Sequence, residues 1–565
     1  MMRISHNDLK CVTALAALYS AAHGLLLFSK VVMWDGRLWA MLLKQKHYDI
    51  LFQYFGQAGL PHIPFMYRLV DALGDPVFYS NVLQFSSWLI AGLCVYLILR
   101  NFVTAGDAFV VAALYLLLPI FIVRFELTVL TYSLSNMFFF LAVYLYLLSE
   151  KMPKKILAVP GYSTAILFFI FSFFTNSFLV FYYGFVSLLL LRYLVRYEIR
   201  FDSATARLTA KWFLKHSLLI LLPIIFYIAQ KLIIGAPYGI YKNYNLFVFL
   251  YPGASIGRTA FLLVDRIWQS IVYGFFWPIL ASISVLQRKV FAAIFMGTGI
   301  VFYLFLRNHV FVRRNGINPP PAPHSNAHLQ YFLAGCALFV LGFVPYILVG
   351  ESPNPYGHGF DMRHGLLLPL GSALIIVSLL HIFLLSIKWH LPAIAIVFSL
   401  FVTFNVFNYY SIDMDGYKQL GIIESLKSKF ETKEISSNAI IVFNDKLPLY
   451  NLRNRELEDS EYTAYVYEAS GSEEALGTFL GNDLSFTFKV KGYKDYPSDK
   501  ELEGRLVYAD IVSSSVQEPT FTNWLKLKKA DLFGSRTEFN NLIKDILAVN
   551  VVIPSRQQSW LEARQ

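Results

Sequence analysis

The sequence has little charge and few cysteines for its length. Only 15% of its 565 residues are Asp, Glu, Lys or Arg, whereas soluble domains carry about 25%. Cys11, Cys94 and Cys336 all lie in apolar stretches, so neither a disulfide framework nor a zinc site is indicated. The sequence also lacks a Walker A motif, a G-x-G-x-x-G after a strand, a nucleophile elbow and an H-E-x-x-H motif. These absences argue against direct use of ATP or a nicotinamide cofactor.

Long uncharged apolar runs recur from residue 12 to residue 408, and the mean hydropathy is +0.51. The bilayer core offers no water to backbone groups, so such runs must form helices or a closed barrel. Runs of roughly 18–22 residues favour helices over ten-residue strands, and they predict a polytopic α-helical membrane protein with about 11 transmembrane helices. The predicted spans are residues 12–32, 82–99, 106–122, 130–148, 162–174, 178–194, 214–234, 290–306, 330–349, 366–387 and 391–408.

Residues 411–565 differ in composition from residues 1–410. The tail holds 19 basic and 24 acidic residues, a net charge of −5, and the rest of the chain has a net charge of +16. Basic loops beside anionic lipid headgroups explain that positive charge, so no nucleic acid is expected as a partner. Strands are predicted at residues 439–443, 463–467, 486–490, 506–512 and 549–553, and an amphipathic helix at 416–430. We therefore expect a transmembrane domain over 1–410 and a small soluble α/β domain over 411–565.

Basic residues cluster in alternate loops, and this bias indicates the orientation of the chain. If residues 256–286 make no net crossing, the N-terminus is cytoplasmic, and residues 33–81, 123–129, 235–289, 350–365 and the tail share the opposite face. If residues 256–286 cross once, everything after them inverts. The first apolar run has no small-residue cleavage site and is expected to be retained. We expect a multi-pass protein of a bacterial inner (plasma) membrane with an extracytoplasmic C-terminal domain.

The first loop, residues 33–81, is the most informative segment. It opens with Trp34-Asp35-Gly36 and continues as an amphipathic run over residues 37–55, which is typical of helices along a membrane surface. A carboxylate where a helix leaves the bilayer is a candidate for a catalytic site. Asp35 is thus either a general base for an acceptor hydroxyl or simply a helix cap or interfacial charge.

Further polar groups fall on the same predicted face. Glu126 is either a second acidic group of the same cavity or the partner of Arg124 in a solvated turn. Arg363 and His364 precede an apolar helix, where backbone N–H groups and a guanidinium favour a phosphate; the alternative is an Arg that snorkels to the interface. Lys242 lies among aromatic residues that are also typical of a membrane belt.

Four blocks of the sequence resemble the GT-C superfamily of integral membrane glycosyltransferases, especially the branch of tetratricopeptide-bearing O-mannosyltransferases. The first is Asp35 after the first helix. The second is Leu-Pro-His-Ile-Pro at 60–64 with Leu-Gly-Asp-Pro at 73–76, where His62 and Ile63 replace the family's Arg. The third joins Pro119 to Glu126. The fourth is Met-Arg-His-Gly at 362–365 with Pro369 and Gly371; there, His and Leu replace two tyrosines of the family.

This resemblance implies a sugar donor carried on a polyprenyl or dolichyl phosphate and a reaction on the extracytoplasmic face. It implies Asp35 as the base that activates the acceptor. In the reaction that we expect, Glu126 is the second catalytic residue, and the lipid phosphate or sugar is bound by Arg363, His364, Lys242, Arg124 and His62. We expect the acceptor to be a cell-envelope glycan, lipid or protein, which the resemblance does not identify, and a requirement for a divalent cation is left open. The tetratricopeptide repeats of that branch are absent. The residues alone also allow a transporter or flippase for a lipid-linked saccharide, or a structural subunit of envelope assembly.

Overall fold

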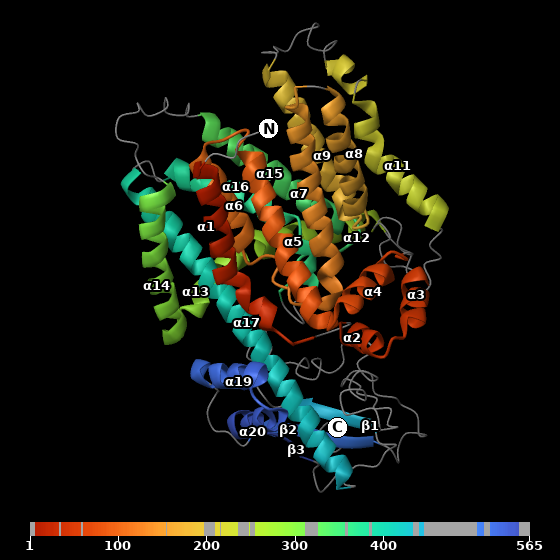
Figure 1. Ribbon diagram of the computed structural model, residues 1–565, viewed down its shortest axis with the longest axis vertical. Helices are drawn as coiled ribbons and strands as arrows, with labels where there is room; N and C mark the ends of the chain where they lie inside the picture. The colour runs from red at the N-terminus through yellow and green to blue at the C-terminus, as the bar shows by residue number, and fades with distance from the viewer. Residues whose placement is uncertain are drawn as a thin grey trace.

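The structure is a computed structural model of the whole chain. It describes residues 6–32, 36–57, 60–153, 155–196, 209–214, 216–234, 248, 255–310, 326–355, 360–383, 387–432, 440–445, 506–513 and 520–552. A body of packed helices carries a smaller C-terminal unit at one end, and the N-terminus lies at the other end (Figure 1). The C-terminal unit comprises three strands and helices α19 and α20.

The first half of the body is built from short and long helices, two of which begin at side-chain caps. The elements are α1 (His6–His23), η1 (Gly24–Phe28), α2 (Gly36–Lys44), α3 (Tyr48–Gln57), α4 (Ile63–Leu73), α5 (Pro76–Leu99), α6 (Ala105–Leu117), η2 (Leu127–Val129), α7 (Leu130–Glu150), α8 (Lys155–Phe173), α9 (Ser177–Arg196) and α11 (Ser217–Ile234). Asp75 caps α5 by accepting hydrogen bonds from the backbone N–H groups of Val77 and Phe78, with Pro76 at the first helical position. Thr104 caps α6 in the same way through the N–H of Asp107.

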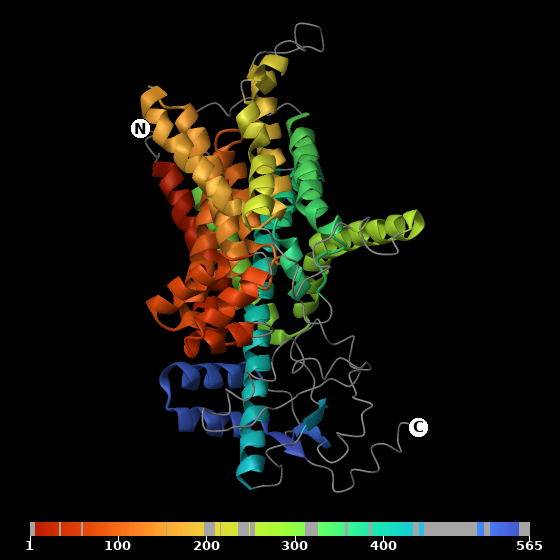
Figure 2. The same cartoon turned by 90° about the vertical axis from the view of Figure 1, so that its right-hand side faces the viewer.

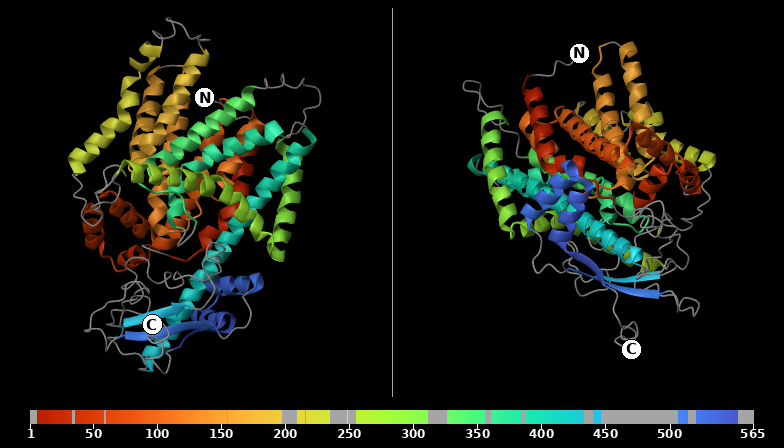
Figure 3. Two further views of the ribbon diagram at one scale, coloured as in Figure 1. Left: turned by 180° about the vertical axis from the view of Figure 1, so that it is seen from behind. Right: turned by 60° about the horizontal axis from the view of Figure 1, so that its bottom comes forward.

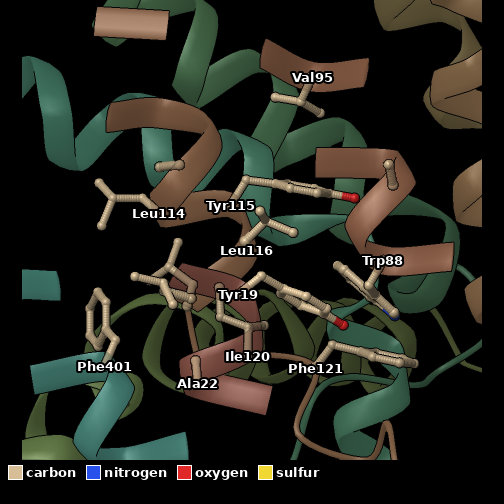
Figure 4. Packing of buried hydrophobic residues seen from close by; sticks show 14 of the residues in the cluster. Tyr19, Ala22, Trp88, Val95, Leu114, Tyr115, Leu116, Ile120, Phe121 and Phe401 are labelled. Carbon is tan, nitrogen blue, oxygen red and sulfur yellow. The ribbon is translucent and has the colours of Figure 1, made fainter. Parts of the chain in front are cut away.

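The second half of the body continues with α12 (Ile256–Ile271), a π-helical turn η4 (Val272–Phe276), α13 (Trp277–Val285), α14 (Lys289–Phe305), η5 (Leu306–Val310), α15 (Asn326–Ile347), η6 (Phe360–Gly365), α16 (Leu368–Phe383) and α17 (Ile387–Glu431). Aromatic residues fill much of the core: Trp88 lies 5.6 Å from the ring of Tyr115 and 5.2 Å from that of Phe121 (Figure 4).

The described helices are those of a helical membrane protein. Seven of them are long and apolar enough to span a membrane: Asp8–Phe28, Pro76–Leu99, Leu127–Glu150, Ile256–Val285, Lys289–Asn308, His328–Ile347 and Trp389–Ile422. Five shorter apolar helices accompany them: Ala105–Leu117, Ala158–Phe173, Ser177–Tyr193, Ser217–Ile233 and Leu368–Phe383. The predicted count of about 11 spans is therefore not confirmed, because helices of spanning length among the described residues number seven.

Residues 256–286, whose course the sequence leaves open, form α12, η4 and α13. Although this segment has the length and hydropathy of a span, α12 lies across the long axes of its neighbours on the back of the body (Figure 3, left). Phe261 and Trp268 on its outer face are 77% and 63% exposed. An amphipathic helix in that position is typical of one that lies in a membrane interface.

Helices α2, α3 and α4 of the first loop lie at the same end of the body as the C-terminal unit (Figure 1). They bury Trp39, Leu43, Leu51 and Tyr67 in a core of their own that continues onto Leu127 and Leu130. The predicted amphipathic run over 37–55 is two helices, because the chain turns at Lys46, which has a φ of 61°. The Lys46 ammonium then pairs with buried Asp71 at 2.6 Å, which joins that turn to α4.

Helix α17 is one continuous helix of 45 residues that runs from the body into the C-terminal unit (Figure 2). The predicted span 391–408 and the predicted amphipathic helix 416–430 are its two ends, and the helix passes through the predicted domain boundary at 410 without a break. Where α17 meets the C-terminal unit it carries a buried charge: Asp413 is 1% exposed and pairs with Lys528 of α19 at 2.9 Å.

The C-terminal unit contains β1 (Ile440–Asp445), β2 (Leu506–Ser513), β3 (Val549–Val552), α19 (Phe521–Phe533) and α20 (Arg536–Leu547). Strand β1 pairs with β2 in parallel, with Ile440 opposite Leu506, and β2 pairs with β3 antiparallel. Three of the five predicted strands thus appear close to their expected limits. The predicted strands 463–467 and 486–490 lie outside the described residues, so the extent of an α/β domain over 411–565 stays a prediction.

Candidate functional site

The centre of the candidate site is a loop inside the protein, residues 118–126, which follows α6 and which we call the buried loop. All of its side chains are buried, Glu126 to 0% exposure and Arg124 to 1%. Irregular backbone beside membrane helices is tolerated where protein surrounds it or where it lines a cavity. Two charged side chains in such a loop indicate a specialised region rather than an ordinary solvated turn.

The backbone carbonyls around the buried loop are satisfied by side chains from other elements. Asn405 and Asn408 of α17 donate to the carbonyls of Leu117 (2.8 Å) and Ile122 (3.4 Å). Gln84 of α5 donates to the carbonyl of Glu126 at 3.0 Å, and Tyr67 of α4 donates to that of Leu127 at 3.3 Å. Because buried carbonyls need partners, the conformation of the buried loop depends on the relative positions of α4, α5 and α17.

Glu126 lies against the start of α2. A Cβ atom built on Gly36 would stand 1.7 Å from the Oε1 atom of Glu126, so a larger residue at this position would require the carboxylate to move. The positive end of a helix dipole favours a carboxylate at that position. Gly36 directly follows Asp35 in the chain, and Asp35 itself lies outside the described residues. The structure thus brings the neighbour of one predicted catalytic residue against the other.

Arg124 does not form the predicted solvated pair with Glu126 in its described contacts. Its Nη1 atom lies 2.9 Å from the Nε2 atom of His23 and donates to the carbonyl of Leu116 at 3.2 Å. Its guanidinium carbon stands 4.1 Å from the centre of the Trp88 ring, an arrangement that stabilises a desolvated cation. Among the described residues, its Nε and Nη2 atoms find no hydrogen-bond partner.

Neutral polar residues that the sequence analysis did not select complete this region. His23 of α1 contacts the Tyr409 hydroxyl at 3.0 Å through Nδ1. The Ser133 hydroxyl donates to the Oε1 atom of Gln84 at 3.3 Å and accepts from the Trp88 indole at 3.2 Å. The signal for these residues was present as polar side chains inside otherwise apolar runs, which are functional candidates in a membrane helix.

Arg363 and His364 lie in η6, the short helix before α16. Arg363 donates to Asp361 at 3.1 Å, and the Nδ1 atom of His364 lies 3.2 Å from the carbonyl of Ser352. Burial, together with the neighbouring Arg363, lowers the pKa of His364 well below its usual value. His364 is therefore a neutral imidazole at pH 7, and the cation of this predicted phosphate-binding pair is Arg363.

The η6 segment touches the buried loop. A Cβ atom on Gly365 would lie 2.7 Å from the Cγ2 atom of Ile120, so the residue next to His364 packs on the loop that carries Arg124 and Glu126. Arg266 of α12 reaches the loop before η6, where it donates to Ser352 at 3.4 Å. It also donates to Gln269 of its own helix at 2.7 Å. Arg266 is thus a second cation near η6 that the sequence analysis missed.

His62 belongs to a different neighbourhood. Its ring packs against that of Phe174 in a tilted arrangement, with 4.3 Å between ring centres, and burial lowers its pKa to about 4. Among the described residues its Nδ1 atom has no hydrogen-bond partner. These contacts make His62 a neutral packing residue between the first loop and the turn that follows α8. Lys242, the remaining predicted binding residue, lies outside the described residues.

One group of side chains in the described part of the chain has the arrangement of a metal site. Glu351, Asp361 and His364 each offer a ligand atom, and these atoms lie within 4.8 Å of one another. Burial and the nearby Asp361 raise the pKa of the Glu351 carboxyl.

No family model, curated protein or solved structure matches this chain.

Proposed function

We propose that this chain is an integral membrane glycosyltransferase of the GT-C type, which moves a sugar from a polyprenyl-phosphate donor to a hydroxyl acceptor in the cell envelope. The observation that carries the proposal is the contact between Gly36 and Glu126. It supports a site in which a carboxylate directly follows the first span and a second carboxylate lies within reach of that position. The order of the four sequence blocks supports the same conclusion.

In the proposed reaction, an acceptor hydroxyl attacks the anomeric carbon of the donor sugar. A bond forms between the acceptor oxygen and that carbon, and the bond from the carbon to the phosphate oxygen breaks. The Asp35 carboxylate takes the hydroxyl proton, and Glu126 orients the acceptor. The lipid phosphate leaves with the bonding electrons and with its negative charge near Arg363, whose guanidinium suits a phosphate.

The remaining predicted residues take lesser parts in this proposal. His364 adds no charge, because it is neutral, and its one N–H faces the carbonyl of Ser352. Arg124 acts through the buried loop, since Trp88 and His23 surround its guanidinium. Lys242 is a further cation for the phosphate. The proposal places the reaction and the C-terminal α/β domain on the extracytoplasmic face of a bacterial inner membrane, with about 11 crossings in total.

The direct test is transfer by the purified protein in lipid nanodiscs, with polyprenyl-phosphate sugars as donors and mass spectrometry of envelope glycans and glycoproteins to find the acceptor. Asp35→Asn should abolish transfer, and Glu126→Gln should reduce it by about 10²-fold through misplacement of the acceptor. Asp49→Asn is the matched control, because Asp49 lies in the same first loop and is exposed. Full turnover by Asp35→Asn would exclude the proposed base.

The same preparations separate the rival functions. A flippase would move a labelled lipid-linked saccharide across a vesicle membrane without changing its mass, and Asp35→Asn would leave the glycan products of cells unchanged. A structural subunit would show neither transfer nor movement, and its loss would alter envelope assembly while purified transferases keep their activity. Either result would replace the proposal.

A further inference from the structure

Two carboxylates and one imidazole converge beyond the end of α15. The ligand atoms of Glu351, Asp361 and His364 lie within 4.8 Å of one another. Atoms bound to a common ion at about 2.0–2.2 Å can lie at most about 4.4 Å apart. The three side chains therefore need to close by only a few tenths of an ångström to bind one ion.

The backbone explains why these residues meet. Asp361 and His364 are three residues apart in η6, a 3₁₀-helix, where side chains at positions i and i+3 lie one above the other. Glu351 comes from the far side of the loop, directly after Gly350, whose φ of 81° turns the chain back toward η6. The sequence signal is thus an Asp-x-x-His on a short helix with a Glu ten residues earlier.

Glu351 lies near the cations Arg363 and Arg266, but of the two carboxylates only Asp361 has a cation in direct contact among the described residues. Arg363 pairs with the Oδ1 atom of Asp361 at 3.1 Å, whereas the nearest described partner of Glu351 is the Nδ1 atom of His364 at 3.8 Å. An imidazole beside two carboxylates is well suited to bind a metal ion. Two carboxylates held together at a half-buried position are stabilised by a divalent cation.

A chain of hydrogen bonds also fixes the orientation of the His364 ring. His364 is 4% exposed, and its Nδ1 atom contacts the carbonyl of Ser352 at 3.2 Å. The Ser352 hydroxyl donates to Gln269 of α12 at 2.5 Å, and Arg266 donates to the same Gln269 oxygen. Contacts of this kind fix the orientation of metal-binding histidines and are part of a metal site.

We propose that Glu351, Asp361 and His364 bind one divalent cation of the Mn²⁺ or Zn²⁺ type. Carboxylates suit Mn²⁺ and imidazole suits Zn²⁺, so this mixed set favours a first-row ion over Ca²⁺. The ion lies beside Arg363, where it adds positive charge next to the proposed phosphate position; this role, unlike the binding itself, rests on the proposed function.

The test measures binding without any donor, so its result is independent of the transfer reaction. The full chain is reconstituted in nanodiscs of zwitterionic lipid, stripped with a chelator and titrated with Mn²⁺ while the spectrum of free Mn²⁺ is followed by electron paramagnetic resonance. We expect one saturable site per chain. Glu351→Gln with Asp361→Asn should weaken binding at least tenfold, and His364→Phe, which keeps the ring beside Tyr346, should do the same. A parallel titration with Zn²⁺ competing for Mn²⁺ shows which ion binds more tightly.

Glu150→Gln is the matched control, because Glu150 pairs with Arg192 in another part of the body; it should bind Mn²⁺ as the natural chain does. The second control is His381→Phe, because His381 lies in a separate group of three histidines with His328 and His390. Thermal unfolding checks that each variant is folded, and Mn²⁺ should raise the melting temperature of the natural chain and of both controls. Absence of a saturable site, or loss of it in His381→Phe instead, would overturn the assignment.

Discussion

Two sets of buried charges at the same end of the molecule are arranged in opposite ways. Asp413 and Lys528 are more than 100 residues apart in the chain, yet they pair at 2.9 Å. Arg124 and Glu126 are separated by one residue, yet their described contacts lead to Trp88 and His23 on one side and to Gly36 on the other. The first set joins two parts of the fold as an ion pair, whereas the described contacts of the second set lead to different neighbours.

This comparison teaches what each set contributes. A buried pair stabilises the fold mainly because loss of either partner leaves a charge without compensation. Buried charged groups in specific local environments are concentrated at functional sites. We therefore expect substitutions in the first set to change stability, and substitutions in the second to change activity.

The largest stability effect should come from Lys528→Met. It leaves Asp413 buried without its partner, and such a loss costs about 3–5 kcal/mol. Unfolding in mixed detergent micelles, together with proteolysis of the C-terminal unit, measures it. The double variant Lys528→Met with Asp413→Leu should recover most of the loss, because no buried charge remains. Equal destabilisation by the single and double variants would contradict this account of the pair.

The largest activity effect should come from Gly36→Ala. The added methyl group would stand 1.7 Å from the Glu126 carboxylate, which must therefore move, and a displacement of about 1 Å costs on the order of 10²-fold in rate. Transfer kinetics of the purified variant measure this loss. Gly56→Ala is the control, because a Cβ atom at Gly56 meets nothing within 4 Å. An active Gly36→Ala would show that the position of Glu126 does not matter.

A smaller stability effect is expected at the buried loop. Asn405→Leu leaves the carbonyl of Leu117 without the donor that now lies 2.8 Å away, and an unsatisfied buried carbonyl costs about 1–3 kcal/mol. The midpoint of unfolding should fall accordingly, and protease cleavage near residues 118–126 should increase. Asn101→Leu, which affects carbonyls at the opposite end of the body, should leave cleavage of the buried loop unchanged.

The smallest effect concerns pH and His62. Its pKa is about 4 in the folded chain and about 6.5 when unfolded. Below pH 6.5 the unfolded chain binds a proton that the folded chain does not, so stability falls as the pH drops from about 6.5 toward 4 and is level above that window. The loss is on the order of 1 kcal/mol after allowance for partial exposure. His62→Phe should remove this slope, whereas His47→Phe, at an exposed position, should keep it.

The sequence predicted the helical elements well where local signals act. Asp75 and Pro76 of the Leu-Gly-Asp-Pro block begin α5, before the predicted span 82–99 and inside the predicted first loop 33–81, and α4 begins at Ile63 within the Leu-Pro-His-Ile-Pro block. Apolar periodicity also located α7, α14 and α15 within a few residues. These features depend on neighbours in the chain, so sequence patterns carry them.

The features that were missed depend on distant partners. The predicted span ends at residue 408 and the predicted amphipathic helix begins at 416; only Lys528, more than 100 residues later, explains how one continuous helix buries Asp413 between them. In the same way, nothing local indicates that His23 contacts Arg124 or that Gln269 and Arg266 lie next to η6. For the candidate site, the sequence selected the charged residues of the buried loop but not the neutral residues that position them.

Helix α17 has a mechanical consequence. At 1.5 Å per residue its 45 residues extend about 67 Å, roughly twice the thickness of a hydrocarbon core. The same rod presents Asn405 and Asn408 to the buried loop, Tyr409 to His23 and Asp413 to α19. A force or a binding partner that tilts the C-terminal unit therefore shifts the loop that carries Arg124 and Glu126, because one rigid helix contacts both.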